Sequence, residues 1–315
     1  MIEATALTKR YGDKLAVDDL SFVVHPGVVT GFLGPNGAGK STTMRMIMGL
    51  DSPTSGSVTV NGMAYRSLRD PLREVGALLE AKSIHSGRSA FNHLLALAQT
   101  AGIGRARVNE VIDLVGIAEV ARKRAGGFSL GMSQRLGIAS ALLGDPHTLI
   151  LDEPVNGLDP DGIRWIRNLL KHLAAEGRTI FVSSHLMSEM AQTAEHLIVI
   201  GRGRLIADTS VSEIIARASG QSVLVRTTDV PSLLAAVAGP EVQTSVDDQG
   251  AVTVHGLTTD EVGVRASREG VTLLELTAQR VTLEDAFMDL TKDSVEYHGH
   301  EADEPAQLAT SGVGA

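Results

Sequence analysis

The sequence predicts an α/β protein built on a mostly parallel sheet and followed by a smaller α+β domain. Short apolar strands alternate with helical stretches through the middle of the chain, which is typical of a parallel sheet covered on both faces. A glycine-rich loop at residues 34–41 joins an apolar strand to a helix. Beyond residues 216–221 the strands alternate apolar and polar residues instead, which indicates half-buried strands.

The N-terminal part is expected to begin with antiparallel strands. Residues 3–7 and 21–25 are short runs rich in β-forming side chains, and the second run ends at a Pro-Gly turn. The pair Asn61-Gly62 between two further short runs predicts a hairpin with a type I′ turn. Apolar residues at helical spacing predict mostly helix over residues 89–144. The remaining strands and helices of the large domain are expected at residues 28–33, 41–50, 148–151, 162–175, 179–183, 188–194 and 197–200.

The chain is expected to divide into a large domain, residues 1–216, and a small α+β accessory domain, residues 221–292. A helical subdomain is expected at about residues 82–144 of the large domain. In the accessory domain a last helix is predicted to open at Thr282, with Asp285 reaching back in a capping box. Its strands are expected at residues 223–226, 251–255 and 271–276.

Residues 293–315 lose all periodicity, and we expect them to form a disordered tail. His298 and His300 flank a glycine in this tail. Two histidines in such a segment are far more often solvated than bound to a metal, so we interpret them as solvated.

Composition and charge exclude several classes of protein. Residues 1–216 carry 22 Lys and Arg against 21 Asp and Glu, whereas the rest carries 6 against 16. This balance argues against a nucleic-acid-binding protein, which needs a basic face. The absence of cysteine excludes disulfides and thiolate metal sites. With no signal-peptide pattern and no apolar run of about 18 residues, the chain itself is expected to be soluble.

The glycine-rich loop matches the phosphate-binding pattern G-x-x-x-x-G-K-[ST]. Glycines let successive backbone N–H groups curl around phosphates, and the helix that follows adds its dipole. Lys40 is expected to reach the β- and γ-phosphates, and Ser41 to offer its hydroxyl to Mg²⁺. The residues predicted to bind nucleotide here are Gly34, Pro35, Asn36, Gly37, Ala38, Gly39, Lys40, Ser41 and Thr42.

An acidic pair ends the apolar strand at residues 148–151. Ligands of α/β proteins bind at the carboxyl ends of parallel strands, so Asp152 is placed to hold Mg²⁺ directly or through water. Glu153 follows it and is a candidate to polarise an attacking water. A solvated turn is the alternative for an isolated acidic pair, but the preceding phosphate loop favours a phosphate-hydrolysing site.

Further stretches resemble the ATP-binding subunits of ABC transporters. Phe128-Ser-Leu-Gly-Met-Ser-Gln-Arg135 is similar to the signature sequence of that family, and it precedes the Asp152 strand at the family's spacing. Asn156-Gly-Leu-Asp159 resembles the D-loop, and Ser183-Ser-His185 resembles the segment that carries the switch histidine. Tyr11 matches the aromatic residue that stacks on adenine. The resemblance covers residues 1 to about 216.

The resemblance implies a P-loop NTPase fold of the ABC ATPase type, with an antiparallel β-subdomain and a helical subdomain. It also implies an ATPase that uses ATP and Mg²⁺, with Lys40, Glu153 and His185 as catalytic residues. In that family the signature completes the ATP site of the opposite subunit. The implied assembly is therefore a head-to-tail homodimer, in which Asp159 crosses the interface and the residues that contact the partner's ATP are Ser129, Gly131 and Met132.

Two positions depart from the usual family pattern. The loop that usually carries a glutamine, which senses Mg²⁺ and the membrane partner, here carries Glu80. The resemblance implies a sensor role and a contact with Mg²⁺ for Glu80, which would join Ser41 and Asp152 at the metal. The signature reads Ser-Leu-Gly-Met-Ser rather than Ser-Gly-Gly-Gln, with its serine and second glycine retained.

Both departures, and the ending at residues 282–291, resemble the ATPases of bacitracin- and daunorubicin-type resistance exporters. Such ATPases drive separately encoded integral membrane permeases of the ABC-2 type from the cytoplasmic face of the cell membrane. The resemblance thus implies a motor subunit for drug or antibiotic efflux, coupled through residues 80–92. An importer ATPase, or a soluble ABC ATPase acting on ribosomes or DNA, stays open as an alternative. The single phosphate loop and the lack of sustained heptads argue against the soluble class.

Overall fold

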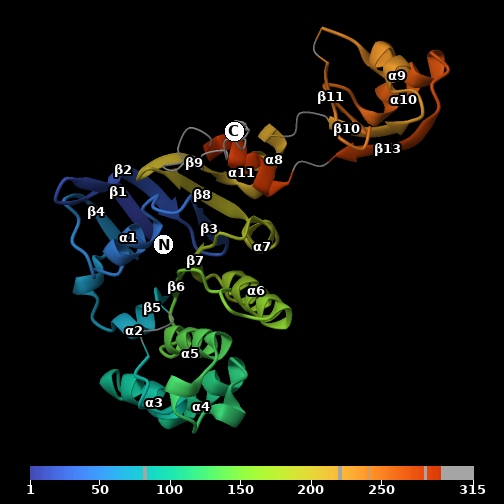
Figure 1. The fold of residues 1–315 in the computed structure, drawn as a ribbon. Coiled ribbons are helices and arrows are strands. Elements are labelled where there is room, and N and C mark those ends of the chain that lie inside the picture. The colour runs from blue at the N-terminus through green and yellow to red at the C-terminus, as the bar shows by residue number, and fades with distance from the viewer. Residues whose placement is uncertain (81–83, 219–221, 241, 280–281, 292–315) are drawn as a thin grey trace, which may run out of the picture.

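The computed structural model describes residues 1–80, 84–218, 222–240, 242–279 and 282–291 (Figure 1). The predicted tail at 293–315, with His298 and His300, lies outside these residues. Across the described part of the chain, no helix is both long and apolar enough to cross a membrane.

The first sheet is antiparallel, as predicted, and has the order β2-β1-β4. The predicted turn at Asn61 and Gly62 is confirmed, because both residues have positive φ, 50° and 79°. The second strand of that hairpin is reduced to one bridge from Val60 to Met63, since the chain turns at once into a 3₁₀ helix. The elements are β1 (Ile2–Tyr11), β2 (Lys14–Val24), β4 (Ser55–Val60) and η1 (Tyr65–Ser67).

The central sheet has six strands in the order β5-β6-β7-β3-β8-β9. All neighbours pair in parallel except β9, which runs antiparallel to β8. Because the strands are parallel, the chain leaves β3, β6 and β7 at the same edge of the sheet. The strands are β3 (Val29–Leu33), β5 (Val75–Leu78), β6 (Thr148–Leu151), β7 (Thr179–Ser183), β8 (His196–Gly201) and β9 (Arg204–Ser210).

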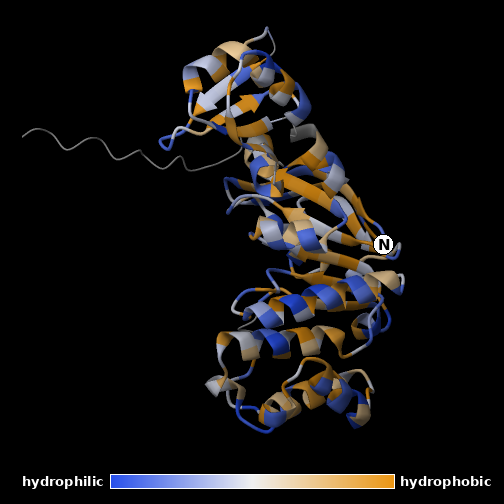
Figure 2. Ribbon diagram, turned by 90° about the vertical axis from the view of Figure 1, so that its right-hand side faces the viewer, coloured by the Kyte–Doolittle hydropathy of each residue, from blue (hydrophilic) through white to orange (hydrophobic). Residues whose placement is uncertain are grey.

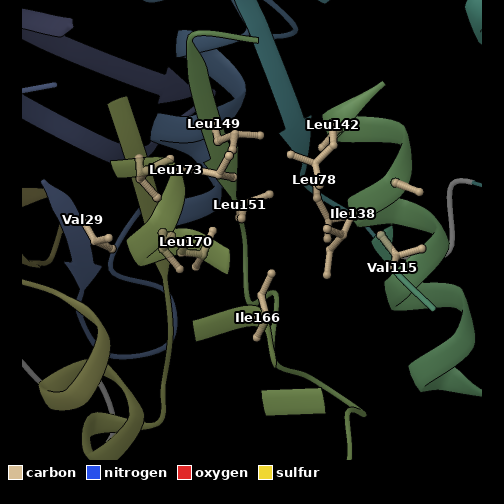
Figure 3. Packing of buried hydrophobic residues seen from close by; sticks show 14 of the residues in the cluster. Val29, Leu78, Val115, Ile138, Leu142, Leu149, Leu151, Ile166, Leu170 and Leu173 are labelled. Atoms are coloured by element: carbon tan, nitrogen blue, oxygen red, sulfur yellow. The ribbon is translucent and has the colours of Figure 1, made fainter. Parts of the chain in front are cut away.

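Both faces of the central sheet are buried, which confirms the prediction. Ile150 and Phe181 point toward the antiparallel sheet, where the rings of Phe32 and Phe181 lie 4.9 Å apart. Leu149 and Leu151 point to the other face and pack with side chains of the helices there (Figure 3). The helices next to the central sheet are α1 (Lys40–Ile47), α2 (Pro71–Glu74), α6 (Pro160–Ala175), α7 (Met187–Thr193) and α8 (Val211–Ala218).

The helical subdomain forms the end of the molecule furthest from the C-terminal strands (Figure 2). Its helices pack through buried residues such as Leu94, Val108 and Leu136, which belong to the same apolar cluster as Leu149. The prediction of mostly helix over residues 89–144 is therefore correct. Two short 3₁₀ turns precede the last of these helices. The elements are α3 (Ala90–Thr100), α4 (Arg105–Leu114), η2 (Ala118–Val120), η3 (Ala125–Gly127) and α5 (Leu130–Leu142).

The C-terminal sheet is antiparallel and has the order β11-β12-β10-β13. With two helices between its strands, the chain follows the β-α-β-β-α-β pattern of ferredoxin-like folds. Its core is a separate apolar cluster that includes Val223, Val254 and Val262. The sequence does not predict β11, because every residue of that strand is exposed. The elements are β10 (Ser222–Thr227), α9 (Val230–Val237), β11 (Gln243–Val246), β12 (Val252–His255), α10 (Thr259–Arg268) and β13 (Leu273–Gln279).

The last helix, α11 (Leu283–Thr291), packs differently from the prediction. Its capping box is present, since the Thr282 hydroxyl accepts from the Asp285 N–H at 3.2 Å and the Asp285 carboxylate accepts from the Thr282 N–H at 3.0 Å. However, α11 contacts α8 and α7 of the large domain (Figure 1). Leu283 and Phe287 belong to the apolar cluster of the central sheet and not to the cluster of the ferredoxin-like unit. The accessory unit therefore has its core in residues 222–279.

Candidate functional site

The glycine-rich loop connects β3 to α1 as predicted. Gly39 has a φ of 104°, and a Cβ atom there would lie 2.6 Å from the carbonyl oxygen of Ala16, so this position requires glycine. The Lys40 ammonium turns back over the loop and donates to the carbonyl oxygens of Gly34 at 2.5 Å and Pro35 at 3.2 Å. Burial lowers the pKa of Lys40, and the nearby carboxylates of Glu153 and Asp152 act in the opposite direction.

The loop opens onto a pocket of about 410 Å³. The structure thus brings most of the predicted nucleotide-binding residues together with the acidic pair. Gly34 and Pro35 do not line this pocket but accept the hydrogen bonds of Lys40. The lining residues are Tyr11, Lys14, Ala16, Asn36, Gly37, Ala38, Gly39, Lys40, Ser41, Thr42, Asp152 and Glu153.

Asp152 lies directly after β6, at the edge of the sheet where the glycine-rich loop also begins. Its Oδ2 accepts a hydrogen bond from the Ser41 hydroxyl at 2.7 Å, and its Oδ1 accepts one from the Ser183 hydroxyl. Ser41 and Asp152 thus offer two adjacent oxygens beside the phosphate loop. Mg²⁺ usually takes only one or two protein oxygens and completes its shell with phosphate and water, so this pair fits the ion.

Glu153 is held from three directions. Its φ is 51°, a left-handed conformation that residues with side chains rarely adopt. Its backbone N–H donates to the Ser183 hydroxyl oxygen at 2.9 Å, and its carbonyl oxygen accepts from the Gln134 side-chain amide at 3.0 Å. Its carboxylate Oε2 lies 2.7 Å from Nδ1 of His185 and accepts from the His185 N–H at 3.3 Å. The predicted base and the predicted switch histidine are therefore in direct contact.

Tyr11 lies at the end of β1 and forms one wall of the pocket, with 46% of its surface exposed. Its hydroxyl donates to Asp51 at 2.7 Å, and Asp51 also accepts from Arg45 at 2.8 Å. Burial, followed by the hydrogen bond to Asp51, raises the pKa of Tyr11. The hydrogen bond from Arg45 is the main cause that lowers the pKa of Asp51. This network fixes the ring while leaving it open toward the pocket.

The signature and D-loop residues lie around a second, separate pocket of about 610 Å³. Ser129 caps α5 by accepting a hydrogen bond from the Met132 N–H at 3.2 Å. Gly131 packs so closely on the D-loop that a Cβ atom there would lie 2.6 Å from the Gly157 carbonyl oxygen. Asp159 caps α6 through the Gly162 N–H at 3.0 Å. Within the described residues of one chain, the pocket that contains Lys40 is lined neither by Asp159 nor by the signature residues Ser129, Gly131 and Met132.

Glu80 is exposed and follows β5 at the same edge of the sheet as Asp152. It does not line the pocket that contains Asp152. The hydrogen bond to Asp51 is the main cause that raises the pKa of Arg45, and Glu80 is the weakest of the causes that raise it. The predicted metal contact of Glu80 therefore stays a prediction.

Sequence analysis missed two residues of this site, Gln134 and Ser183. Both stand inside stretches that carry the family resemblance, but neither received a role. Ser183 carries a recognisable signal, since it is a polar residue at the end of the buried strand β7 and is itself fully buried. Gln134 is 2% exposed on α5, and its partner lies 19 residues away along the chain, a distance that no local pattern reveals.

Comparison with known proteins gives two family matches. Residues 17–156 match the family described as ABC transporter, and residues 221–284 match a domain of unknown function. The second match lies almost wholly within the ferredoxin-like unit described above.

Several curated proteins are similar over most of the chain. The bacitracin transport ATP-binding protein BcrA of Bacillus licheniformis is 44% identical over 211 residues, which cover 66% of this chain and 69% of that protein. The lantibiotic transport ATP-binding protein SrtF of Streptococcus pyogenes is 37% identical over 208 residues, which cover 66% of this chain and 90% of that one. The Nod factor export ATP-binding protein I of Rhizobium sp. (strain N33) is 35% identical over 301 residues, which cover 94% of this chain and 98% of that one.

Solved structures show the same fold. An ATP-binding subunit of an ABC transporter superposes with a TM-score of 0.64 at 26% identity and covers 69% of this chain and 92% of its own. The dimeric structure of a bacterial ABC transporter cassette superposes with a TM-score of 0.62, also at 26% identity, over 67% of this chain and 98% of its own.

Proposed function

This chain belongs to the ATP-binding proteins of ABC transporters, which are Mg²⁺-dependent ATPases, and we propose that it is the motor subunit of an exporter for antibiotic-like compounds. The observation that carries the proposal is the convergence of Lys40, Ser41, Asp152, Glu153 and His185 from three segments on one edge of the central sheet. The names of the similar bacitracin and lantibiotic transport proteins support the class of cargo, and the name of the similar Nod factor export protein supports the direction.

Each residue of the pocket has a proposed task. The loop N–H groups and Lys40 bind the β- and γ-phosphates, and Ser41 and Asp152 hold Mg²⁺, which neutralises phosphate charge when bound. Glu153 accepts a hydrogen bond from the attacking water and polarises it toward the γ-phosphate. His185 orients the Glu153 carboxylate and contacts the γ-phosphate. Tyr11 stacks on the adenine ring.

We further propose that the motor works as a head-to-tail pair of this chain. The separate pocket lined by Ser129, Gly131 and Met132 supports this arrangement, because these residues do not line the phosphate-loop pocket of their own chain. In the pair they contact the ATP held by the partner copy, and Asp159 lies at the interface. The similar cassette that was solved as a dimer supports the same assembly.

The proposed partner is a separately encoded integral membrane permease of the ABC-2 type, with this chain bound to its cytoplasmic face. The Nod factor export protein, which is similar along nearly the whole chain, supports an export system in which the C-terminal unit is retained. ATP binding closes the pair, and hydrolysis reopens it. The transported compound contacts the permease and not this chain.

The test is affinity capture of this chain from detergent-extracted native membranes, combined with ATPase assays. We expect a polytopic membrane protein to be captured, and the Glu153→Gln variant to bind ATP but not hydrolyse it. Capture of only soluble partners by an active ATPase would contradict the transporter assignment. Capture of a permease together with a periplasmic-type binding component would contradict export.

A further inference from the structure

Gln134 is a buried polar residue that none of the proposed steps of hydrolysis uses. It lies on α5, is 2% exposed, and its Nε2 donates to the carbonyl oxygen of Glu153 at 3.0 Å. The N–H of Asn156 donates to the same oxygen at 3.2 Å, as part of the turn that follows. The bond from Gln134 therefore ties the carbonyl oxygen of Glu153 to the signature helix.

Glu153 depends on such ties because of its backbone conformation. Its φ of 51° is strained for a residue with a side chain, and strain of this kind persists only where the surroundings impose it. Ser183 at the end of β7 holds the N–H of Glu153, and Gln134 on α5 holds its carbonyl oxygen. A shift of α5 relative to β7 would therefore rotate the peptide groups on either side of Glu153 and re-aim its carboxylate.

The same helix begins at the second pocket. Ser129 caps α5, and Ser129, Gly131 and Met132 all line that pocket. Gln134 follows the cap by five residues, which is about 7.5 Å along the helix axis. Because α5 is a continuous helix of 13 residues, a group bound at its start moves Gln134 with it.

We propose that Gln134 is a positioning residue that connects the two ATP sites of the pair. ATP held by the partner binds at the start of α5, and the Gln134–Glu153 hydrogen bond transmits the position of α5 to the catalytic carboxylate of the same chain. In each chain, the Glu153 carboxylate therefore points at the attacking water only when ATP held by the partner occupies the second pocket of that chain. This inference rests on the proposed function, since it requires the pair and the catalytic role of Glu153.

The test uses Gln134→Met in the full-length chain, a change that keeps the side-chain volume but removes the donor. The carbonyl oxygen of Glu153 keeps its bond from Asn156, so we expect the variant to fold with an unchanged melting temperature. The kcat for ATP hydrolysis should fall about 100-fold, because a small misplacement of a catalytic group costs about that much, while KM changes less than about twofold. The matched control is Ser140→Ala on the same helix, whose hydroxyl donates to the Leu136 carbonyl at 3.0 Å and whose loss should leave kcat unchanged.

A second readout separates positioning from a general role in shaping α5. ATP-dependent dimer formation is measured by size-exclusion chromatography in the Glu153→Gln background, with and without Gln134→Met. We expect equal dimer formation in the two proteins, since Ser129 and Gly131 are untouched. Loss of dimer formation together with kcat, or a wild-type kcat in Gln134→Met, would overturn the proposal. If Glu153→Gln alone leaves hydrolysis intact, the catalytic role of Glu153 fails, and this inference falls with it.

Discussion

Nδ1 of His185 lies 2.7 Å from Oε2 of Glu153, and the His185 N–H donates to the same oxygen at 3.3 Å. The two residues come from the ends of neighbouring strands, β7 and β6. One oxygen of the carboxylate is thus fixed by His185, which leaves the other to interact with water. We therefore expect the histidine and the glutamate to act as one functional unit.

Because they form one unit, His185→Ala and Glu153→Gln should not have additive effects on hydrolysis. We expect each change alone to lower kcat by about 10²- to 10⁴-fold, the range for a general base, and the double variant to be little worse than Glu153→Gln. Steady-state ATPase assays on the three proteins measure this. The control is His196→Ala, since His196 pairs with Asp208 on the β8–β9 hairpin at 2.6 Å. Additive losses would mean that the two residues act independently.

Ser183 holds both carboxylate residues at once. Its hydroxyl donates to Asp152 and accepts from the Glu153 N–H. Ser183→Ala would leave a buried N–H without a partner, so we expect a loss of about 1–3 kcal/mol in the free energy of unfolding, together with a fall in kcat. Urea unfolding and ATPase assays measure both quantities. Ser188→Ala, at an exposed position of α7, is the matched control. A stable but inactive Ser183→Ala protein would show that the hydroxyl acts in catalysis rather than in holding the backbone.

Tyr11 is expected to contribute to affinity through its ring rather than its hydroxyl. Stacking on a base contributes about 1–3 kcal/mol, so Tyr11→Ala should weaken ATP binding by about 5- to 150-fold. Tyr11→Phe keeps the ring and should bind ATP nearly as well as the wild type. Titration with a fluorescent ATP analogue measures the three dissociation constants. Equal losses in both variants would indicate that the hydrogen bond to Asp51 is what matters.

Ionisation of Tyr11 should not affect this affinity near neutral pH. Burial and the hydrogen bond to Asp51 raise the pKa of Tyr11 above its ordinary value of 10.0. The hydroxyl therefore stays protonated throughout the neutral range, and the contribution of Tyr11 to ATP binding should be constant between about pH 6 and pH 9. We expect the ratio of the Tyr11→Phe and wild-type dissociation constants to be flat over that interval.

The functional residues of the site could be predicted where they are consecutive in the sequence. The phosphate loop and the pair Asp152-Glu153 each occupy one short segment between a strand and the following turn or helix. The parallel sheet then brings their ends together for a general geometric reason. Gln134 and Ser183 could not be assigned in this way, because their roles consist of single hydrogen bonds to Glu153 from segments that are distant in sequence.

The fold was predictable to the same extent. The continuous apolar run Leu149, Ile150 and Leu151 indicates a strand buried on both faces, and the structure divides these residues between two apolar clusters. The strand β11 carries no apolar pattern and left no signal. The helix that opens at Thr282 was expected, but its sequence alone cannot specify the partner on which it packs.

The packing of α11 on the large domain leads to the last prediction. Phe287 is 7% exposed and packs, with Leu283, in the cluster that contains Met187 and Met190 of α7. Removing a large buried ring leaves a cavity, so Phe287→Ala should lower the free energy of unfolding by about 3–5 kcal/mol. The control is Met288→Ala on the same helix, where the side chain is 57% exposed and its loss should change little.

The melting transition that is lowered in Phe287→Ala shows whether α11 is part of the large domain or of the ferredoxin-like unit. ATP stabilises only the part of the protein that binds it, so in a thermal scan ATP identifies the melting transition of the large domain. We expect Phe287→Ala to lower that transition and to leave the transition of the ferredoxin-like unit unchanged. If only the ATP-insensitive transition falls, α11 is part of the accessory unit after all. Because α7 begins two residues after His185, a fall in the ATP-sensitive transition would also show that α11 stabilises the domain that carries the contact between His185 and Glu153.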